Sequence, residues 1–318
     1  MIAFEELRII FFGTPDFAVA SLDALVQAGA NVVAVVTAPD KPAGRGMQLK
    51  GSAVKEYAVS KNITALQPEK LKDAAFIEEL RSLGADLQVV VAFRMLPEIV
   101  WNMPKMGTIN VHASLLPQYR GAAPINWAII NGEQETGVTT FKLQHAIDTG
   151  DILLQQKVPI TDDDNAGSLH DKLMAAGAGL LVATVKGLAD GTLQEMPQTA
   201  SPELRHAPKI FKEDTRINWQ RPVGEIQNFI RGMSPHPAAF AMLGSTMIKV
   251  YRSHFEIEAH DKYGNAILGY QYTDVIYETD GKSYLRFAGP DGWVYIDELQ
   301  QEGKKRMGVV EFLRGYRG

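Results

Sequence analysis

The sequence predicts an α/β protein in which a doubly wound, mostly parallel sheet is followed by a smaller β-barrel. In the first part of the chain, continuous apolar runs of the kind that form buried strands alternate with helical patterns. After a proline-containing stretch, the pattern changes to short β-like runs separated by turn signals, which is typical of a small barrel. The length of 318 residues also favours two domains.

The first part of the chain supplies the strands and helices of the sheet domain. We expect strands at residues 7–12, 32–36, 87–93 and 108–112, and a possible hairpin from 137–143 and 152–158. Helices are expected at 16–28, 54–60, 73–83, 122–131 and 166–188. Asp16 is a candidate cap of the first helix, and Ser168 with Asp171 has the spacing of a capping box. The stretch 38–51 is rich in Pro, Gly and basic residues, which predicts a loop.

A break in the pattern separates the two predicted domains. Residues 190–210 contain Pro197, Pro202 and Pro208 and show little periodicity, so we interpret 190–208 as a linker between domains at 1–189 and 209–318. In the second domain a helix is expected at 223–232. Strands are expected at 239–243, 247–251, 274–278, 284–287 and 293–299.

Composition narrows the class of protein. There is no cysteine, which excludes disulfides, thiolate metal sites and a cysteine nucleophile. The first residues lack a signal-peptide pattern, and no apolar run approaches the roughly 20 residues of a membrane helix, so we expect a soluble, cytoplasmic protein without a membrane partner. Residues 209–318 hold 15 basic and 14 acidic side chains, whereas residues 1–208 hold 17 and 23. A nucleic-acid partner would therefore depend on local basic patches.

The residues that follow the predicted strands are the candidate site, because ligands of such sheets bind beyond the carboxyl ends of the strands. Asn110 and His112 alternate on one strand and so share a face. The Asp148-Thr-Gly turn can bring a carboxylate back over the sheet. Each residue also fits a structural role, Asn110 as a turn or cap residue and His112 as a satisfied polar group.

Other motifs exclude several classes of site. Gly13-Thr-Pro-Asp16 follows the first strand but is not G-x-G-x-x-G, which argues against a nicotinamide oxidoreductase. The acidic stretch 162–164 lies just before a helix, where negative charge is favoured, so no metal site is expected. The basic cluster Lys304, Lys305 and Arg306 fits a solvated face, or a phosphate contact beside the barrel.

Several strings of residues carry a family resemblance. NVHASLLPQYRGAAPI at 110–125, followed by ETGVT at 135–139 and DTGD at 148–151, closely resembles the methionyl-tRNA formyltransferases. The resemblance begins with FGTPDF at 12–17, continues through PDKPAGRG at 39–46 and reaches KIFKEDTRINW at 209–219 and SPHP at 234–237. It covers nearly the whole chain. The central string is specific for folate-dependent formyl transfer, and the flanking strings favour the tRNA branch.

The resemblance implies a fold, substrates and site residues. It implies a Rossmann-like formyltransferase domain followed by an OB-like barrel, with Asn110, His112 and Asp148 as catalytic residues. The formyl donor would be 10-formyltetrahydrofolate, and the acceptor the methionine carried by initiator tRNA. The folate-binding residues expected near the strand ends are Val91, Ala92, Phe93, Leu96, Ser114, Leu115, Leu116 and Pro117. The expected tRNA contacts are Arg45, Lys41 and Lys50 in the 39–51 loop, together with Lys304, Lys305 and Arg306.

These groups suit transfer of a formyl group to an amine. An amide and a protonated imidazole can donate hydrogen bonds to the oxyanion of the tetrahedral intermediate. A carboxylate can orient the imidazole and assist removal of the amine proton. No metal is required, and we expect a monomer. Two alternatives stay open at this point: a folate-dependent formyltransferase acting on an amino sugar-nucleotide, and a non-catalytic RNA-binding or folate-binding module.

The chain departs from the family pattern at three places. Phe93-Arg94 stands where Tyr-Gly is expected, which places a cation near the folate pocket, where it could pair with a folate carboxylate or point outward. Gln118-Tyr119 replaces Arg-Trp, with the loss of one positive charge, and Leu143-Gln144 replaces Met-Asp. None of these departures falls on the expected catalytic residues.

Overall fold

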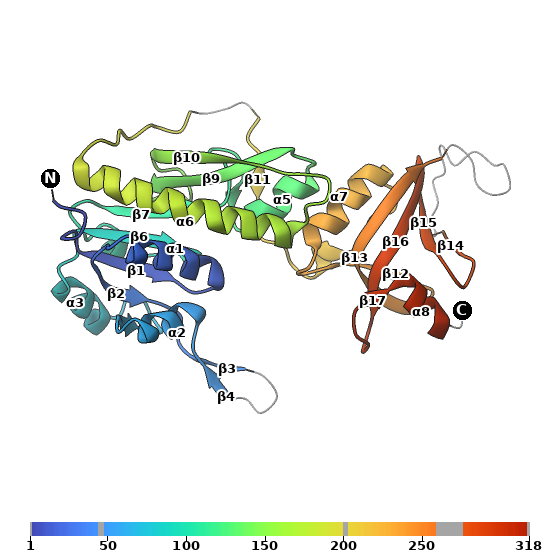
Figure 1. Cartoon of the computed structure of the whole chain (residues 1–318), viewed down its shortest axis with the longest axis horizontal. Helices are drawn as coiled ribbons and strands as arrows, with labels where there is room; N and C mark the ends of the chain where they lie inside the picture. The colour runs from blue at the N-terminus through green and yellow to red at the C-terminus, as the bar shows by residue number, and fades with distance from the viewer. Residues whose placement is uncertain (1, 44–47, 200–202, 259–275, 317–318) are drawn as a thin grey trace. The chain divides into compact units, whose positions relative to one another are not determined.

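The structure is a computed structural model, and it describes residues 2–43, 48–199, 203–258 and 276–316 (Figure 1). The chain forms two compact units that do not follow a single cut in the sequence. Unit 1 contains Met1–Gly121, Glu135–Pro159 and His170–His206; unit 2 contains Ala122–Gln134, Ile160–Leu169 and Ala207–Gly318.

Unit 1 is built on a seven-stranded sheet with the order β10-β9-β7-β6-β1-β2-β5. Strands β7, β6, β1, β2 and β5 run parallel, whereas β9 and β10 form an antiparallel hairpin whose first strand also pairs antiparallel with β7. The mostly parallel sheet predicted from the apolar runs is thereby confirmed. The bounds are β1 (Ile9–Gly13), β2 (Val32–Val36), β5 (Thr64–Leu66), β6 (Leu87–Val91), β7 (Thr108–His112), β9 (Glu135–Lys142) and β10 (Ile152–Pro159).

Helices cover both faces of this sheet, which is why its central strands are apolar on both sides. On one face, Phe76 and Leu80 of α3 (Ala74–Ser82) join a core with Ile10 and Phe12 of β1. Figure 1 shows α1 (Asp16–Gln27) and α6 (Ala166–Asp190) crossing the sheet on one side. The remaining elements of this unit are α2 (Ala53–Ser60), α4 (Glu98–Trp101) and the short strand β8 (Arg120–Gly121). The short strand β11 (His206–Ala207) begins with the last residue of unit 1, and its second residue, Ala207, belongs to unit 2.

By length and apolar composition, α6 passes as a candidate membrane span. Its contacts within unit 1 are those of a core helix. Gly177 lies against Val111 and Val138 of the sheet, and the hydroxyls of Thr184 and Thr140 are 2.8 Å apart. Leu173, Leu181 and Val185 are fully buried. The apolar face of α6 is therefore explained by its packing on the sheet.

Two helix starts differ from the expectation. Asp16 is the first residue of α1 and does not cap it; the capping position is Pro15, which makes no side-chain cap. At the start of α6 the cap is Asn165, whose Oδ1 accepts from the backbone N–H of Gly167 and Ser168, while Ser168 Oγ accepts from Asn165 N. Ser168 thus fills the reciprocal position of the box, and the cap lies three residues earlier than the Ser168–Asp171 spacing indicated.

The basic stretch 38–51 contains two short strands rather than a loop alone. β3 (Lys41–Ala43) and β4 (Gln48–Lys50) pair antiparallel, with Lys41 opposite Lys50. The interpretation as a loop was therefore wrong at these two segments. The turn-forming composition hid the pairing, because Pro42 and the glycines mask the β pattern.

Unit 2 contains an antiparallel sheet wrapped around a helix. The order is β12-β13-β16-β15-β14, and β17 also pairs with β16. Ile226 and Ile230 of α7 lie in one core with Val250, Phe287 and Val294 of the sheet. The bounds are α5 (Pro124–Ile130), the short 3-10 helix η1 (Glu213–Thr215), α7 (Val223–Met233), β12 (Ala239–Leu243), β13 (Thr246–Ile257), β14 (Tyr277–Thr279), β15 (Leu285–Gly289), β16 (Gly292–Gln301), β17 (Met307–Gly308) and α8 (Val309–Gly315).

This second sheet is a half-barrel, since β12 and β14 do not pair within the described residues. The predicted small β-barrel is thus confirmed as a second β domain, which has the form of an antiparallel half-barrel. Strand β13 continues to Ile257, well beyond the expected end at Tyr251, because the residues of its outer half are exposed except for Ser253 and carry no continuous apolar signal. The short helix α8, which places Phe312 and Leu313 in the core, was not predicted.

Candidate active site

His112 is the last residue of β7 and its imidazole is buried. Its Nε2 lies 2.9 Å from the carbonyl oxygen of Tyr119. A carbonyl can only accept a hydrogen bond, so Nε2 carries the hydrogen. The other ring nitrogen, Nδ1, lies 3.9 Å from Oδ2 of Asp148, which is too long for a direct hydrogen bond. The backbone of Tyr119 therefore fixes the ring, and Nδ1 is left toward the carboxylate.

Asp148 lies in the turn between β9 and β10, where its backbone has a φ of 55°. Few side chains accept this left-handed conformation, and Asp is among those that do. Its Oδ2 accepts a hydrogen bond of 3.0 Å from the backbone N–H of Gly121. The predicted return of the carboxylate over the sheet is thus present in the structure, since Asp148 reaches the end of β7 from the turn of the neighbouring β9–β10 hairpin.

Asn110 lies two residues before His112 on the same strand and is half-buried. Its backbone pairs with Val90 and Phe141 on the neighbouring strands. No hydrogen bond to its side chain is made by any residue that the structure describes. The amide is therefore not tied to a cap or a turn, and its N–H groups are available to a ligand.

The pair His112 and Asp148 is well shielded from water. Their side chains are 8% and 13% exposed. The arrangement offers an amide donor, an imidazole with one open nitrogen, and a carboxylate that can take up a proton.

The loop after His112 is held by side chains of the β9–β10 hairpin. The hydroxyl of Thr139 donates to the carbonyl of Ser114 at 2.6 Å and accepts from the N–H of Leu116 at 3.1 Å. Gln155 Nε2 donates both to the carbonyl of Leu116 and to the same hydroxyl, at 2.9 and 3.0 Å. Ser114 Oγ closes the loop by donating to the carbonyl of Gln118 at 2.7 Å. The loop is thus fixed before any ligand arrives.

The expected folate residues leave the sheet from neighbouring strands, because Val91 at the end of β6 pairs with Val111 on β7. Leu143 packs against the core that contains Leu96 and also against the core that contains Leu116. It therefore links the two expected segments beside the Asp148 turn.

Not all of the expected folate side chains are open to a ligand. Ala92 is exposed and has a φ of 47°, and the half-buried Phe93 lies edge-on to Phe12. Leu115 and Pro117 are half-buried. The rest are core residues that can offer mainly their backbone: Val91, Leu96, Ser114 and Leu116.

Arg94 points away from the site. Its Nη1 donates to the carbonyl of Glu69 at 2.8 Å and its Nη2 donates to the carbonyl of Pro68. Its guanidinium also lies 5.7 Å from the ring centroid of Phe93. Of the two roles considered from the sequence, the outward one agrees with these contacts.

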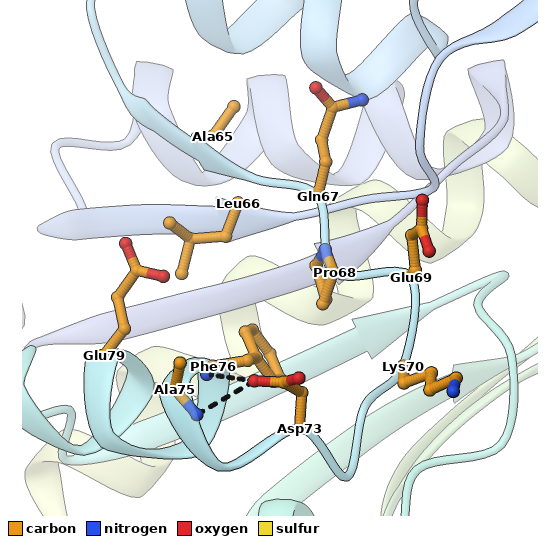
Figure 2. A pocket seen from close by; sticks show the side chains of 10 residues that line it. All are labelled: Ala65, Leu66, Gln67, Pro68, Glu69, Lys70, Asp73, Ala75, Phe76 and Glu79. Atoms are coloured by element: carbon orange, nitrogen blue, oxygen red, sulfur yellow. Dashed lines mark hydrogen bonds between the residues drawn. The ribbon is translucent and has the colours of Figure 1, made fainter.

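A hollow of about 610 Å³ lies beside β5 and α3 (Figure 2). Its charged lining is mainly acidic, with Glu69, Asp73 and Glu79 against Lys70. Asp73 is used as the cap of α3, accepting from Ala75 N at 2.9 Å. No expected site residue lines this hollow, so it is distinct from the candidate active site.

The β3–β4 hairpin presents like charges in register, with Lys41 opposite Lys50. Both side chains are exposed, and neither forms an ion pair with any described residue. At the foot of the hairpin, Asp40 accepts from Gln67 Nε2 at 2.7 Å and pairs with Lys55 at 2.5 Å, and these contacts lower the pKa of the Asp40 carboxyl. Arg45, the remaining expected contact in this stretch, lies outside the described residues.

In unit 2 the basic cluster is partly neutralised. Arg306 makes two hydrogen bonds to Glu298, at 2.7 and 2.6 Å, and stacks 4.3 Å above the ring of Tyr251. Lys305 lies 3.7 Å from Glu311 in an exposed pair, and Lys304 is exposed. Lys304 and Lys305 are therefore better placed than Arg306 to meet a phosphate.

Four further residues shape the site through contacts that the sequence analysis did not assign to them. Tyr119 and Gly121 act through their backbone, which no side-chain pattern reveals. Thr139 lies on β9 and Gln155 on β10, and both strands contain other polar residues that do not contact the loop after His112.

The comparisons with known proteins agree with this geometry. Residues 7–185 match the family described as formyl transferase, and residues 209–317 match the formyl transferase C-terminal domain. Among solved structures, the fold is similar to an N-formyltransferase from Helicobacter canadensis in complex with folinic acid and dTDP-3-aminofucose. The TM-score is 0.66, with 22% identity over 95% of this chain and 100% of that one. The fold and the matched domains define a formyltransferase.

Curated relatives show which formyltransferases this chain is similar to in sequence. Methionyl-tRNA formyltransferase from Bacteroides thetaiotaomicron is 53% identical, over 98% of this chain and 97% of the relative. The protein of the same name from Phocaeicola vulgatus is 55% identical, over 98% and 97%. That from Flavobacterium johnsoniae is 47% identical, over 98% and 96%. The chain belongs to the methionyl-tRNA formyltransferase family and is an enzyme.

Proposed function

We propose that this enzyme transfers the formyl group of 10-formyltetrahydrofolate to the amino group of methionine on initiator tRNA. The observation that carries the proposal is the shielded His112–Asp148 pair beside an unengaged Asn110, in a chain about half identical to curated methionyl-tRNA formyltransferases over nearly its full length. The reaction would serve translation initiation and would take place in the cytoplasm, where initiator tRNA is charged.

The chemical step joins the amine nitrogen to the formyl carbon and then breaks the bond from that carbon to N10 of the folate. The carbonyl oxygen becomes an oxyanion in between. The Asn110 amide donates to this oxyanion, and so does His112 in its protonated form. Since Nε2 of His112 is held by the Tyr119 carbonyl, Nδ1 is the nitrogen that meets the reacting group. Removing one donor of this kind typically costs about 10²–10³ in rate.

The proton balance is carried by the carboxylate. The attacking amine must lose one proton as the new bond forms, and N10 of the departing tetrahydrofolate gains one. Asp148, held by Gly121 N–H beside His112, is placed to accept the amine proton, to return it to N10 as the bond to the formyl carbon breaks, and to stabilise the imidazolium in between. Such proton transfer contributes typically about 10²–10⁴ in rate.

For the donor, the segments after β6 and β7 provide the proposed folate contacts. They leave the same edge of the sheet, and hydrogen bonds from Thr139 and Gln155 hold the loop 114–118 in place. The exposed Ala92 and the half-buried Phe93, Leu115 and Pro117 offer side-chain surface. A preformed loop supports binding because little conformational freedom is lost when the ligand arrives.

For the acceptor, we propose that tRNA meets the β3–β4 hairpin and the C-terminal domain at 209–318, joined to the domain at 1–189 through 190–208. Like charges directly opposite each other destabilise a hairpin. The facing Lys41 and Lys50 therefore suit the binding of an anion, which would offset their repulsion. Arg45 belongs to the same stretch of sequence. Lys304 and Lys305 supply positive charge in the second unit. Arg306 contributes less, because its charge is paired with Glu298.

The test is a formylation assay with purified protein, 10-formyltetrahydrofolate and initiator tRNA charged with methionine. Uncharged tRNA and an amino sugar-nucleotide serve as parallel acceptors. Formylation of the charged tRNA alone supports the proposal, and formylation of the sugar alone overturns the acceptor. His112→Ala and Asn110→Ala should each abolish most turnover, and normal rates in both variants would contradict the assigned roles.

A further inference from the structure

Gln198 lies in the segment that follows α6, and its side chain contacts the Asp148 turn directly. Its Nε2 donates to the backbone carbonyl of Asp148 at 2.9 Å and to that of Gly150 at 2.7 Å. Its Oε1 accepts from Nε and Nη2 of Arg120, at 3.1 and 2.6 Å. The side-chain amide of Gln198 thus hydrogen-bonds through its nitrogen to one loop of the candidate active site and through its oxygen to the other.

These contacts complete a closed ring of hydrogen bonds. Gly121 N–H binds the carboxylate of Asp148, and the preceding residue, Arg120, is tied through Gln198 to the backbone of the same Asp148. The turn is therefore held twice, once through its side chain and once through its carbonyl. Removal of Gln198 opens the ring while the Gly121 contact remains.

The segment that carries Gln198 is itself docked on the hairpin. Met196 and Ile152 exchange backbone hydrogen bonds of 2.8 and 2.9 Å at the start of β10. Glu195 pairs with Lys142 at the end of β9, with 2.5 Å between the charged atoms. The two strands that flank the Asp148 turn are thus both contacted, which leaves Gln198 little freedom in its approach.

We propose that Gln198 is a positioning residue that sets the place of the Asp148 carboxylate relative to His112. The proposal rests on the formyl-transfer function proposed above. Asp148 lies 3.9 Å from Nδ1 of His112 and has a left-handed backbone, so its place depends on how the turn is held. A displacement of about 1 Å at a reacting group can cost about 10²-fold in rate.

The first test compares single-turnover formylation rates of wild type, Gln198→Ala and Gln198→Glu. Loss of the amide donor in both variants should lower the rate by about tenfold or more, with the KM for folate and for charged tRNA nearly unchanged. Gln194→Ala is the matched control, since it removes an exposed glutamine from the same segment and should keep the wild-type rate. If Gln198→Ala does not fold, Gln198→Met keeps the length of the side chain and takes its place. Rates of the Gln198 variants within about twofold of wild type would overturn the proposal.

The second test separates positioning from a general structural role. Residues that act through one another are non-additive, so Gln198→Ala should cost little further rate once Asp148→Asn has removed the carboxylate. An equal loss in both backgrounds would reject the proposal. A wild-type protein that formylates no charged tRNA would instead reject the function, and the two failures are therefore distinguishable.

Discussion

The imidazole of His112 and the carboxylate of Asp148 face each other at 3.9 Å, and each is hydrogen-bonded to a backbone group rather than to the other. Tyr119 holds the ring through its carbonyl, and Gly121 holds the carboxylate through its N–H. The two groups are thus held by backbone atoms two residues apart in one loop, and not by each other. Nδ1 of the imidazole stays open to a substrate, which a direct hydrogen bond between the pair would prevent.

Asp148→Asn should lower the formylation rate by about 10²-fold or more, because the amide cannot take up the amine proton. Asparagine also tolerates the φ of 55° and can still accept from Gly121 N–H, so the fold should be kept. Single-turnover rates and thermal unfolding check both statements. An active Asp148→Asn protein would remove the carboxylate from the mechanism.

Thr139→Val should destabilise the loop after His112. The substitution keeps the shape of the side chain but leaves the N–H of Leu116 without its partner, and an unsatisfied buried donor costs about 1–3 kcal/mol. Urea unfolding of the variant measures this loss, and the KM for folate should rise if the loop binds it. Thr139→Ser keeps the hydroxyl and is the control; equal stability of Thr139→Val and wild type would refute the assigned role.

Lys41→Gln combined with Lys50→Gln should weaken the use of tRNA without changing the chemical step. Each lost phosphate contact reduces the slope of log affinity against log salt by about 0.7–0.9. The KM for charged tRNA at several salt concentrations is the measurement. Lys72→Gln with Lys105→Gln removes the same charge from exposed positions elsewhere in unit 1. An equal effect of the two pairs would point to net charge instead of a local contact.

Arg306→Gln should reduce stability at neutral pH by up to about 1 kcal/mol, since the pair with Glu298 is partly exposed. Arg306 lowers the pKa of the Glu298 carboxyl below its ordinary value. Such a group stabilises the fold above its unfolded pKa of about 4.3, and the contribution is lost as the pH falls through the lower folded pKa. The difference in unfolding free energy between wild type and variant should therefore shrink toward acid. Lys305→Gln, in a more exposed pair, should change little at any pH.

The sequence predicted the central sheet because strands buried on both faces carry an unmistakable apolar run. Ile9–Gly13 and Leu87–Val91 are examples, each fully buried. It also predicted a small β-barrel in the second domain from the short, turn-separated runs, and the structure has an antiparallel half-barrel there. The hairpin of Lys41 and Lys50 was missed because its stability comes from the pairing of two short strands that no apolar alternation marks.

The candidate site was predictable only in its side chains. Asn110 and His112 stand out as polar residues on one strand and Asp148 as an acidic residue in a turn. Tyr119 and Gly121 instead contribute a backbone carbonyl and N–H, which no side-chain pattern marks. Gln198 was hidden for a different reason. It lies among prolines without periodicity, and its partners are up to 78 residues away in the sequence.

The place of Gln198 along the chain affects how the active site is completed during synthesis. A nascent chain that has grown only to the end of α6 at Asp190 already contains Asn110, His112 and Asp148, but not the amide that holds the Asp148 turn. The family match to the first domain ends earlier still, at residue 185. A catalytic domain that is cut out, or joined to a different partner domain, has to retain the chain past residue 198. The role proposed for Gln198 thus assigns the first half of the expected linker 190–208 to the catalytic site.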